Sequence, residues 1–428
     1  MNNVRLAVVS THPIQYYAPI FQILARSPVL RTRVFYTWSQ AAGGSVADAG
    51  FGRAITWDIP LLEGYEFEFV PNVARRPGTG HFWGLRNPGL VGAIENWGAD
   101  AVLVFGWNAA SHLSTMLRFK GRIPVFFRGD STLLDRSSWW RTRARRAALS
   151  WVYRHVDVAV AVGSNNRDYF LWCGIPSERV AFAPHAIDVR RFSDPDGAHQ
   201  ERAMQWRREL GIPAGARTLV YAGKLVPKKD PLLLLEAFMN CGASGYLVFV
   251  GDGALESELR ARASNRSDVR FLPFQNQQAM PAVYRLGDVF VLPSRGPGET
   301  WGLALNEAMA ARRAVVAGSK VGGARDLVTE GVTGWTFESG NLQQLTAVVK
   351  NALSCDQAAL SAMSAAAAEE SARWSVEAAA AGIESAILHF ARGSFVRQFA
   401  KPSHGAPKIK SQARTSPKRA GIERTGRY

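Results

Sequence analysis

Residues 293–323 read PSRGPGETWGLALNEAMAARRAVVAGSKVGG and are the most informative part of the sequence. They follow the apolar run Val289–Leu292, whose length and β-branched content are typical of a buried parallel strand, which the next Pro-Ser pair stops. A glycine-containing loop then leads to Glu299 and to a helical pattern over 303–311. In an open α/β sheet, ligands bind beyond the carboxyl ends of strands, where helix amides hold anions. The stretch therefore predicts a phosphate site.

Two carboxylates lie near the start of the predicted helix. Glu299 and Glu307 are eight residues apart, and at 3.6 residues per turn Glu307 points roughly back toward the side from which Glu299 enters. Carboxylates are poor phosphate ligands but good acceptors for sugar hydroxyls, so the pair suits a phosphate flanked by sugars. An amphipathic helix with a capping glutamate is the alternative interpretation.

The stretch ETWGLALNEAMA, followed by VVAGSKVGG, resembles the donor-binding signature of glycosyltransferase family 4. The strand before it and Gly322 and Gly323 after it make the match specific. The resemblance covers about 218–380 well and the first domain more loosely. It implies the α/β GT-B fold, in which two Rossmann-like domains face each other across a cleft. It also implies a retaining, hexosyl-type transferase that moves a sugar from a nucleotide-diphosphate donor to an acceptor hydroxyl, in polysaccharide or glycolipid synthesis.

The composition limits the class of protein. The chain has 428 residues, 47% of them hydrophobic, and 39 glycines, which suits two α/β domains. It has no apolar run of membrane-spanning length, and the apolar part of MNNVRLAVVSTHP is too short for a secretory signal. Cys173, Cys241 and Cys355 are too scattered for a disulfide framework or a metal site. These features predict a cytoplasmic protein.

The net charge of +16 is concentrated in two segments. Residues 395–428 carry nine lysines and arginines against one glutamate and few large apolar side chains, which predicts a disordered basic tail. Residues 136–154 carry six arginines and no acid, with Trp140 and Trp151 at helical spacing. Basic residues beside tryptophan suit docking at an anionic membrane surface, here the inner face, and the tail suits the same partner. An arginine-coated helix on an ordinary core is the alternative.

Strands and helices alternate in two cycles, which predicts two domains with parallel sheets. The expected domains are 1–190 for the acceptor, 191–375 for the donor, a helix over 376–394 that crosses back to the first domain, and the tail over 395–428. Stretches 43–52 and 75–84 read as loops. The expected strands are 4–9, 33–37, 66–70, 101–105, 124–128 and 158–162, then 218–222, 246–250, 269–273, 289–292, 314–317 and 335–337.

Residues 223–229, GKLVPKK, follow a predicted strand and resemble the family stretch GRLxxxKG, in which an arginine and a lysine contact the donor diphosphate. The resemblance places Lys224 where arginine is usual and Lys229 where lysine is usual. Lysine is a point charge without the bidentate fork, so charge compensation is kept and rigid orientation is weakened. A solvated basic loop is the alternative.

The resemblance implies the remaining donor-site roles. Lys224 and Lys229 act as electrostatic catalysts, Glu299 holds the donor sugar and Glu307 holds the ribose. The implied donor-binding positions are Gly223, Phe274, Gly302, Leu303, Gly322 and Gly323. For Phe274 a place in the core is the alternative, and for Gly322 and Gly323 it is packing on the neighbouring helix. No side chain stands out as a general base, which fits a retaining front-face mechanism.

Candidate residues of the first domain follow its predicted strands. His12 and His112 lie after the first and fourth of them, where they would face the cleft and contact the donor sugar or the acceptor. Arg128-Gly129-Asp130 also follows a predicted strand and would shape the acceptor pocket. A structural role is the alternative for each histidine. The first loop lacks the paired glycines that many relatives place against the donor phosphate.

No metal and no cofactor are predicted. Asp194-Pro195-Asp196 spells the D-x-D of metal-dependent glycosyltransferases of another fold, but it lies in a proline-containing turn of the interdomain connection. A nucleotide-sugar epimerase of the same fold, a catalytically silent relative and a basic protein that binds nucleic acid or another polyanion are the alternative functions. The basic charge lies in one helix and one tail without an aromatic platform, so no specific nucleic acid is expected.

Overall fold

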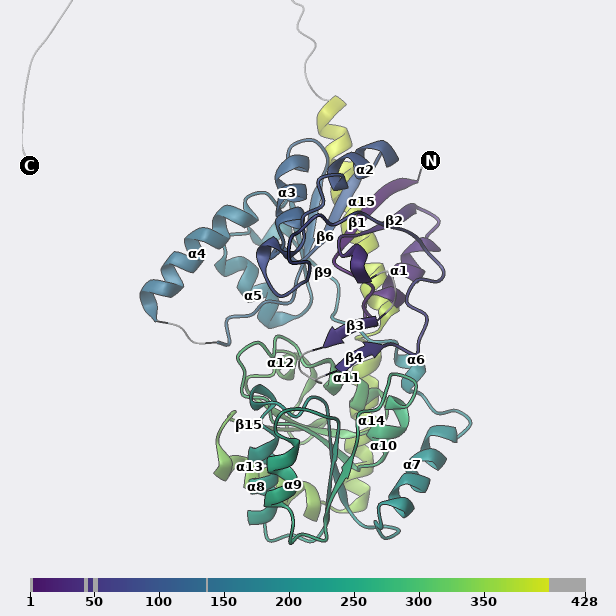
Figure 1. The fold of residues 1–428 in the computed structure, drawn as a ribbon, viewed down its shortest axis with the longest axis vertical. Coiled ribbons are helices and arrows are strands. Elements are labelled where there is room, and N and C mark those ends of the chain that lie inside the picture. Colours follow the sequence, from purple (N-terminus) through teal and green to yellow (C-terminus); the bar gives the residue numbers. More distant parts are fainter. Residues whose placement is uncertain (1–2, 42–44, 49–52, 136–137, 400–428) are drawn as a thin grey trace, which may run out of the picture.

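Two α/β domains lie one above the other in the computed structural model (Figure 1). The structure describes residues 3–41, 45–48, 53–135 and 138–399. Both domains contain a parallel sheet in which the strands are largely buried and helices cover both faces. This arrangement confirms the predicted fold of two Rossmann-like domains.

The N-terminal sheet has seven parallel strands in the order β5-β2-β1-β6-β7-β8-β9. Its strands are β1 (Val4–Ser10), β2 (Leu30–Tyr36), β5 (Glu66–Phe69), β6 (Ala101–Phe105), β7 (Val125–Arg128), β8 (Val158–Ala161) and β9 (Val180–Phe182). Its helices are α1 (Ala18–Ala25), α2 (Leu90–Trp97), α3 (Ala110–Phe119), α4 (Trp139–Tyr153) and α5 (Ser164–Trp172). Strand β9, only three residues long, has no counterpart among the predicted strands.

The C-terminal sheet has six parallel strands in the order β12-β11-β10-β13-β14-β15. They are β10 (Thr218–Ala222), β11 (Tyr246–Val250), β12 (Val269–Leu272), β13 (Val289–Leu292), β14 (Ala314–Gly318) and β15 (Gly334–Phe337). The helices are α6 (Val189–Phe192), α7 (Ala198–Glu209), α8 (Pro231–Asn240), α9 (Glu256–Arg262), α10 (Met280–Arg285), α11 (Leu303–Ala310), α12 (Ala324–Leu327), α13 (Leu342–Ser354) and α14 (Gln357–Ala372). The strand order reverses between β10 and β13, which opens a crevice at their carboxyl ends.

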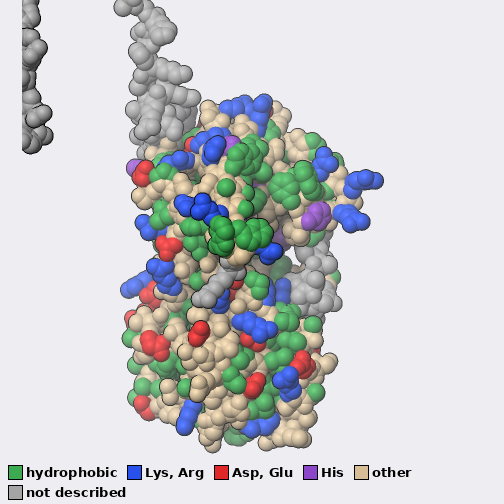
Figure 2. All heavy atoms as spheres, turned by 90° about the vertical axis from the view of Figure 1, so that its left-hand side faces the viewer, with side chains coloured by type: hydrophobic (Ala, Val, Ile, Leu, Met, Phe, Trp, Pro, Cys, Tyr) green, Lys and Arg blue, Asp and Glu red, His purple; other side chains and the backbone are tan. Residues whose placement is uncertain are grey.

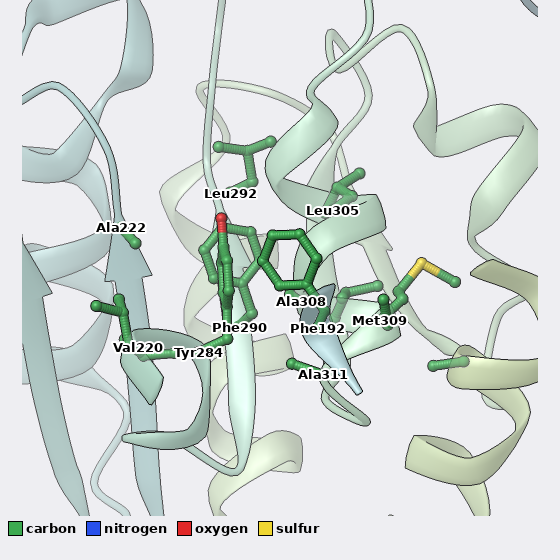
Figure 3. Close-up of a cluster of buried hydrophobic side chains, with 14 of the residues drawn as sticks. Phe192, Val220, Ala222, Tyr284, Phe290, Leu292, Leu305, Ala308, Met309 and Ala311 are labelled. Atoms are coloured by element: carbon green, nitrogen blue, oxygen red, sulfur yellow. The ribbon is translucent and has the colours of Figure 1, made fainter. Parts of the chain in front are cut away.

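Helix α11 is held by a fully buried cluster (Figure 3). Its Leu305, Ala308 and Met309 pack in one core cluster with Phe290 of β13, and Leu305 is completely buried. Burying an aliphatic side chain of this size stabilises the fold by about 1.5–3 kcal/mol. The packing therefore fixes the start of α11 at the crevice.

The chain crosses between the domains twice, and the two crossings are paired. Ile187 and Ser375 form a parallel bridge, and Val376 donates its backbone N–H to the Ile187 carbonyl at 3.2 Å. Helix α15 (Val376–Phe399) then packs on α1, β8 and β9 of the N-terminal domain (Figure 1). It continues five residues past the expected end at 394, because no proline interrupts the sequence before Pro402. The rest of the predicted tail, 400–428, lies outside the described residues.

The expected loop over 43–52 is wrong in part. Strands β3 (Ser45–Asp48) and β4 (Arg53–Thr56) pair antiparallel and lie at the junction of the two domains (Figure 1). The glycines around them predict a loop, but a two-stranded ladder needs only four extended residues on each side. The remaining part of 43–52 lies outside the described residues.

Candidate active site

A cavity of about 390 Å³ lies at the carboxyl ends of β10, β11 and β13 and is lined by both domains. Its volume is in the range of a site for a nucleotide-sized ligand. Many of the predicted site residues line it: Gly223, Lys224, Lys229, Phe274, Glu299, Gly302, Leu303 and Glu307. The structure thus brings together residues that are far apart in the sequence.

One end of the cavity is cationic. Lys224, Lys228 and Lys229 all line it, and the Nζ atom of Lys229 lies 2.5 Å from Oε2 of Glu299. The Ser294 hydroxyl donates to the same carboxylate oxygen at 3.0 Å. Lys228 was not among the predicted residues, although the Lys-Lys doublet is the signal that could have indicated it. Several lysines around one carboxylate leave a net positive charge for an anionic ligand.

The start of α11 opens into this cationic end. Gly302, Leu303 and Ala304 line the cavity, and no side chain caps the helix. Gly302 has φ of 91°, and a Cβ there would lie 2.6 Å from Cγ1 of Val321, so only glycine fits. Uncapped amides at a helix start carry partial positive charge and bind anions.

Glu307 is buried and faces the cavity. The Tyr284 hydroxyl donates to its Oε2 at 2.5 Å, and Nη2 of Arg191 lies 3.8 Å from its Oε1. Burial raises the pKa of Glu307, while Arg191 and the hydroxyls of Tyr284 and Tyr16 act in the opposite direction. Its Oε1 has no hydrogen-bond partner among the described residues. A buried acceptor without a donor suits a ligand hydroxyl.

Gly322 and Gly323 are absent from the cavity lining and lie against the loop that precedes α11. The Gly322 N–H donates to the Glu299 carbonyl at 3.0 Å, and the Gly323 N–H donates to the Trp301 carbonyl at 2.7 Å. A Cβ on Gly322 would lie 1.8 Å from the Thr300 carbonyl oxygen. The two glycines therefore hold the 299–301 loop in place and act on the cavity through it.

His112 is fully buried in the N-terminal domain and is absent from the cavity lining. Its Nδ1 donates to the Gly106 carbonyl at 2.8 Å, so its Nε2 accepts from the Thr37 hydroxyl at 2.9 Å. Burial lowers its pKa. Both ring nitrogens are used within the domain, which indicates a structural role.

His12 and Arg128 also lie outside the cavity lining. The His12 ring packs edge-on against Trp38 with ring centroids 5.3 Å apart, and burial lowers its pKa to about 4. Arg128 donates to the carbonyls of Ala183 and Pro184, both at 2.7 Å, and burial lowers its pKa to about 10. Arg128 therefore fixes the start of the interdomain connection and does not shape a pocket directly.

Other cavity residues were missed from the sequence. Tyr284 and Gln277 line it, and Gln277 accepts a hydrogen bond from Arg191 at 2.8 Å. Asp130, by contrast, belongs to the predicted Arg128-Gly129-Asp130 stretch; it lines the cavity and accepts a hydrogen bond from the Thr300 hydroxyl at 2.5 Å, which ties the donor-side loop to the opposite domain. Tyr284 lies in a helical pattern that looks like ordinary core, so no local signal marks it.

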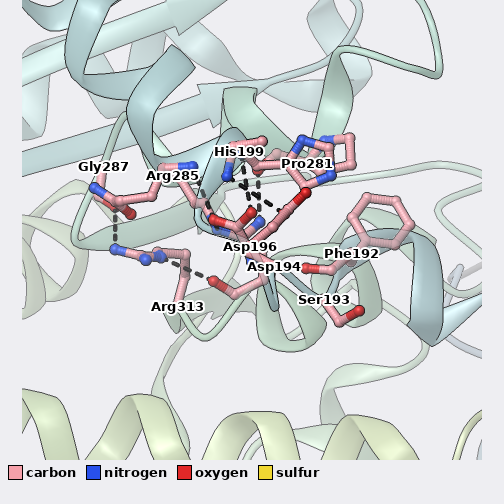
Figure 4. A network of polar contacts seen from close by, with 12 residues as sticks. Phe192, Ser193, Asp194, Asp196, His199, Pro281, Arg285, Gly287 and Arg313 are labelled. Atoms are coloured by element: carbon pink, nitrogen blue, oxygen red, sulfur yellow. Dashed lines mark hydrogen bonds and ion pairs between the residues drawn. The ribbon is translucent and has the colours of Figure 1, made fainter.

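The Asp194-Pro195-Asp196 turn has a structural role (Figure 4). Asp194 accepts hydrogen bonds from the backbone N–H groups of His199 and Gln200 at 2.9 and 2.8 Å, and its carboxylate lies 3.4 Å from Nε of Arg285. Burial opposes ionisation, yet these donors lower the pKa of Asp194 overall. Across the described part of the chain, no three His, Cys, Asp or Glu side chains gather as a metal site needs.

Two facing Rossmann-like domains with a shared cavity between them define the chain as a GT-B protein. Residues 203–371 match the family model described as Glycosyl transferases group 1, and residues 52–191 match the one described as Glycosyltransferase Family 4. The chain belongs to glycosyltransferase family 4, as the sequence signature predicts.

Curated relatives are about a quarter to a third identical in sequence to this chain over the aligned residues. The D-inositol 3-phosphate glycosyltransferase of Corynebacterium glutamicum (strain R) is 27% identical over 51% of this chain and 56% of its own length. The GDP-mannose-dependent alpha-(1-6)-phosphatidylinositol monomannoside mannosyltransferase of Mycolicibacterium smegmatis is 29% identical over 50% of this chain and 58% of its own. The chain thus spans about half the length of the curated relatives it matches.

Solved structures show the same fold over nearly the whole chain. Anabaena HepE in complex with UDP has a TM-score of 0.68 at 20% identity and covers 91% of this chain and 100% of its own. WaaG, a glycosyltransferase involved in lipopolysaccharide biosynthesis, has a TM-score of 0.60 at 15% identity and covers 90% of this chain and 99% of its own. These likenesses confirm the two-domain arrangement.

Proposed function

We propose that the protein transfers a sugar from a nucleotide-diphosphate donor to an acceptor hydroxyl. The observation that carries the proposal is the shared cavity, in which lysines and the start of α11 lie beside the carboxylates of Glu299 and Glu307. Cations and helix amides suit the diphosphate, and carboxylates suit the hydroxyls of the two sugars that flank it.

The chemistry needs stabilisation of the leaving group. As the bond from the sugar to the diphosphate breaks, negative charge grows on the diphosphate, and Lys224, Lys229 and the α11 amides stabilise that charge. In this proposal no metal is required. Glu307 accepts from the ribose through its unpartnered Oε1, and Glu299 orients Lys229 while it accepts from the donor sugar.

Retention at the anomeric carbon is part of the proposal and is supported by membership of glycosyltransferase family 4. The names of the curated relatives, a D-inositol 3-phosphate glycosyltransferase and a phosphatidylinositol mannoside mannosyltransferase, favour a polyol or lipid-linked sugar as acceptor. We place the reaction in glycolipid or cell-surface polysaccharide synthesis. NMR of the product formed from an α-linked donor would show an α linkage if retention holds and a β linkage if it does not.

Thermal unfolding in the presence of a panel of nucleotide sugars tests the function. A donor that binds only the native state must raise the unfolding temperature, by an amount equivalent to about 2.7 kcal/mol at 100 times its Kd. Protection by at least one nucleotide sugar, abolished by Glu307→Ala, is the expected result. Absence of protection across the panel would contradict the proposal. An epimerised nucleotide sugar formed without acceptor would identify the epimerase instead.

We further propose that the protein works at the inner face of a membrane and docks there through α4. This helix projects from the N-terminal domain (Figure 1), and Trp139, Trp140 and Trp151 are 75%, 55% and 45% exposed. Lys and Arg side chains lie beside hydrophobic ones on the face of that domain shown in Figure 2. Exposed tryptophans beside arginines match the headgroup layer of an anionic bilayer. No helix in the described ranges is long and apolar enough to cross a membrane.

Vesicle binding tests the docking surface. Arg141→Glu with Arg145→Glu should weaken binding to phosphatidylglycerol-containing vesicles at least roughly 30-fold, at about 1 kcal/mol per basic residue. The matched control is Arg202→Glu with Arg208→Glu on α7, which makes the same charge change on exposed positions of the other domain. Equal losses in both variants would show a general charge effect and would contradict docking through α4.

A further inference from the structure

A segment of the N-terminal domain is tied to the donor side of the cavity. At the last residue of β4, the Thr56 carbonyl accepts a hydrogen bond from Nδ2 of Asn276 at 2.9 Å. Asp58 accepts from the Gln278 N–H at 3.1 Å, and its carbonyl accepts from the Gln278 side chain. These hydrogen bonds join residues about 220 positions apart in the sequence. Both neighbours of Trp57 are therefore anchored to the 276–278 segment.

Trp57 lines the same cavity as the predicted donor-site residues. It lies between the two anchored residues, and the 276–278 segment that anchors them follows directly on Phe274 and Gln275, which also line the cavity. The anchoring fixes the backbone of Trp57 at this edge of the cavity.

The cavity lining has two chemically different parts. Lysines, Glu299 and the start of α11 make one part strongly polar. The lining toward the 274–280 segment is supplied instead by Trp57, Phe274, Gln275 and Met280, which carry no charge. A nucleotide has the same asymmetry, with a charged diphosphate at one end and a flat aromatic base with hydrogen-bonding edges at the other.

We propose that Trp57 is a nucleobase-binding residue, supplied by the N-terminal domain, that stacks on the base of the donor. The inference rests on the proposed function and extends it, because it assigns part of donor recognition to the domain expected to bind the acceptor. Tryptophan offers a large rigid ring with few rotatable bonds, which suits stacking on any base.

The anchoring segment also reaches the predicted ribose site. Gln277, between the two residues that bond Thr56 and Asp58, accepts from Arg191, whose guanidinium lies 3.8 Å from Glu307. A base stacked on Trp57 would therefore lie beside the residues that meet its own ribose. Asp58 acts as a positioning residue, since it holds the segment and does not line the cavity.

Calorimetric titration of the full chain with UDP, GDP, ADP and inorganic pyrophosphate separates the base from the diphosphate. Trp57→Ala should weaken binding of the best nucleoside diphosphate by between about 5-fold and about 150-fold, the range for loss of base–aromatic stacking, and leave pyrophosphate affinity unchanged. Trp57→Phe should restore most of the loss. Asp58→Ala should also weaken nucleoside diphosphate binding more than pyrophosphate binding. A general loss of structure would weaken both.

Trp83→Ala is the matched control, because Trp83 is 64% exposed in the same domain and does not line the cavity. The proposal is overturned if Trp57→Ala leaves nucleoside diphosphate affinity unchanged, or if it weakens pyrophosphate by the same factor. If unaltered protein binds nucleoside diphosphates and Trp57→Ala has no effect, only the role of Trp57 fails. If unaltered protein binds neither nucleoside diphosphates nor pyrophosphate, both the role of Trp57 and the proposed function fail.

Discussion

Replacing Lys229 with methionine should weaken binding of a nucleoside diphosphate, because it removes one positive charge from the cavity lining. Methionine keeps an unbranched apolar stem and removes the charge. Unit charges 4 Å apart interact by about 4 kcal/mol at an effective dielectric constant of about 20. The Lys229 side chain is 18% exposed and already bonds Glu299, so the ligand gains only part of this energy. Charged hydrogen bonds contribute about 1.5–3 kcal/mol, which predicts an increase in Kd of about 10- to 150-fold.

The assay is calorimetric titration with UDP and GDP, alongside chemical denaturation. Lys229→Met also leaves Glu299 without its ion-pair partner in a site where that carboxylate is 8% exposed, so stability should fall. Adding Glu299→Gln should restore stability but not affinity. Lys350→Met is the control for charge, because Lys350 is exposed and lines a different pocket. Unchanged affinity in Lys229→Met, with the control also unchanged, would refute the role of Lys229 at the diphosphate.

Three further changes test other parts of the site. Glu307→Gln should weaken nucleoside diphosphate binding about 10-fold or more. Glu307→Gln should also raise the free energy of unfolding near pH 8. The pKa of Glu307 is higher in the folded protein than its usual value of 4.5, so its contribution to stability is full below pH 4.5 and is lost as the pH rises through the folded-state pKa. A gain in stability that persists at pH 4 would contradict this argument. Gly322→Ala should lower the free energy of unfolding by about 1–3 kcal/mol and weaken donor binding, because its Cβ would meet the Thr300 carbonyl. The control is Gly92→Ala in α2, where the space is open; it should raise the free energy of unfolding by about 0.5–1 kcal/mol. His112→Asn should lower the free energy of unfolding by about 1–3 kcal/mol, because hydrogen bonds of the buried ring are lost, and should leave UDP and GDP affinity unchanged. Lost affinity with unchanged stability would favour the predicted role of His112 at the cleft.

Local patterns in the sequence predicted the part of the site that one strand, one loop and one helix build. The buried run at Val289–Leu292 and the helical spacing to Glu307 fix the direction of the chain through the crevice. Gly223 and Lys224 follow a strand end in the same way, so their place at the cavity could also be predicted.

The missed residues depend on contacts between distant parts of the chain. Arg191 and Tyr284 reach Glu307 from α6 and α10, and no local spacing links these segments. Trp57 follows a short strand pair in a glycine-containing stretch that reads as a loop. His112 follows a strand end, as predicted, but its ring turns inward to Thr37, and only the packing of the domain decides that direction.

The most direct test of the proposed site is a crystal structure with the nucleoside diphosphate that protects the protein best against unfolding. The diphosphate should lie within hydrogen-bond distance of Lys229 and the first amides of α11, with a ribose hydroxyl on Glu307. A nucleotide bound outside the cavity between the two domains, or bound with its phosphates away from Lys229 and α11, would contradict the account.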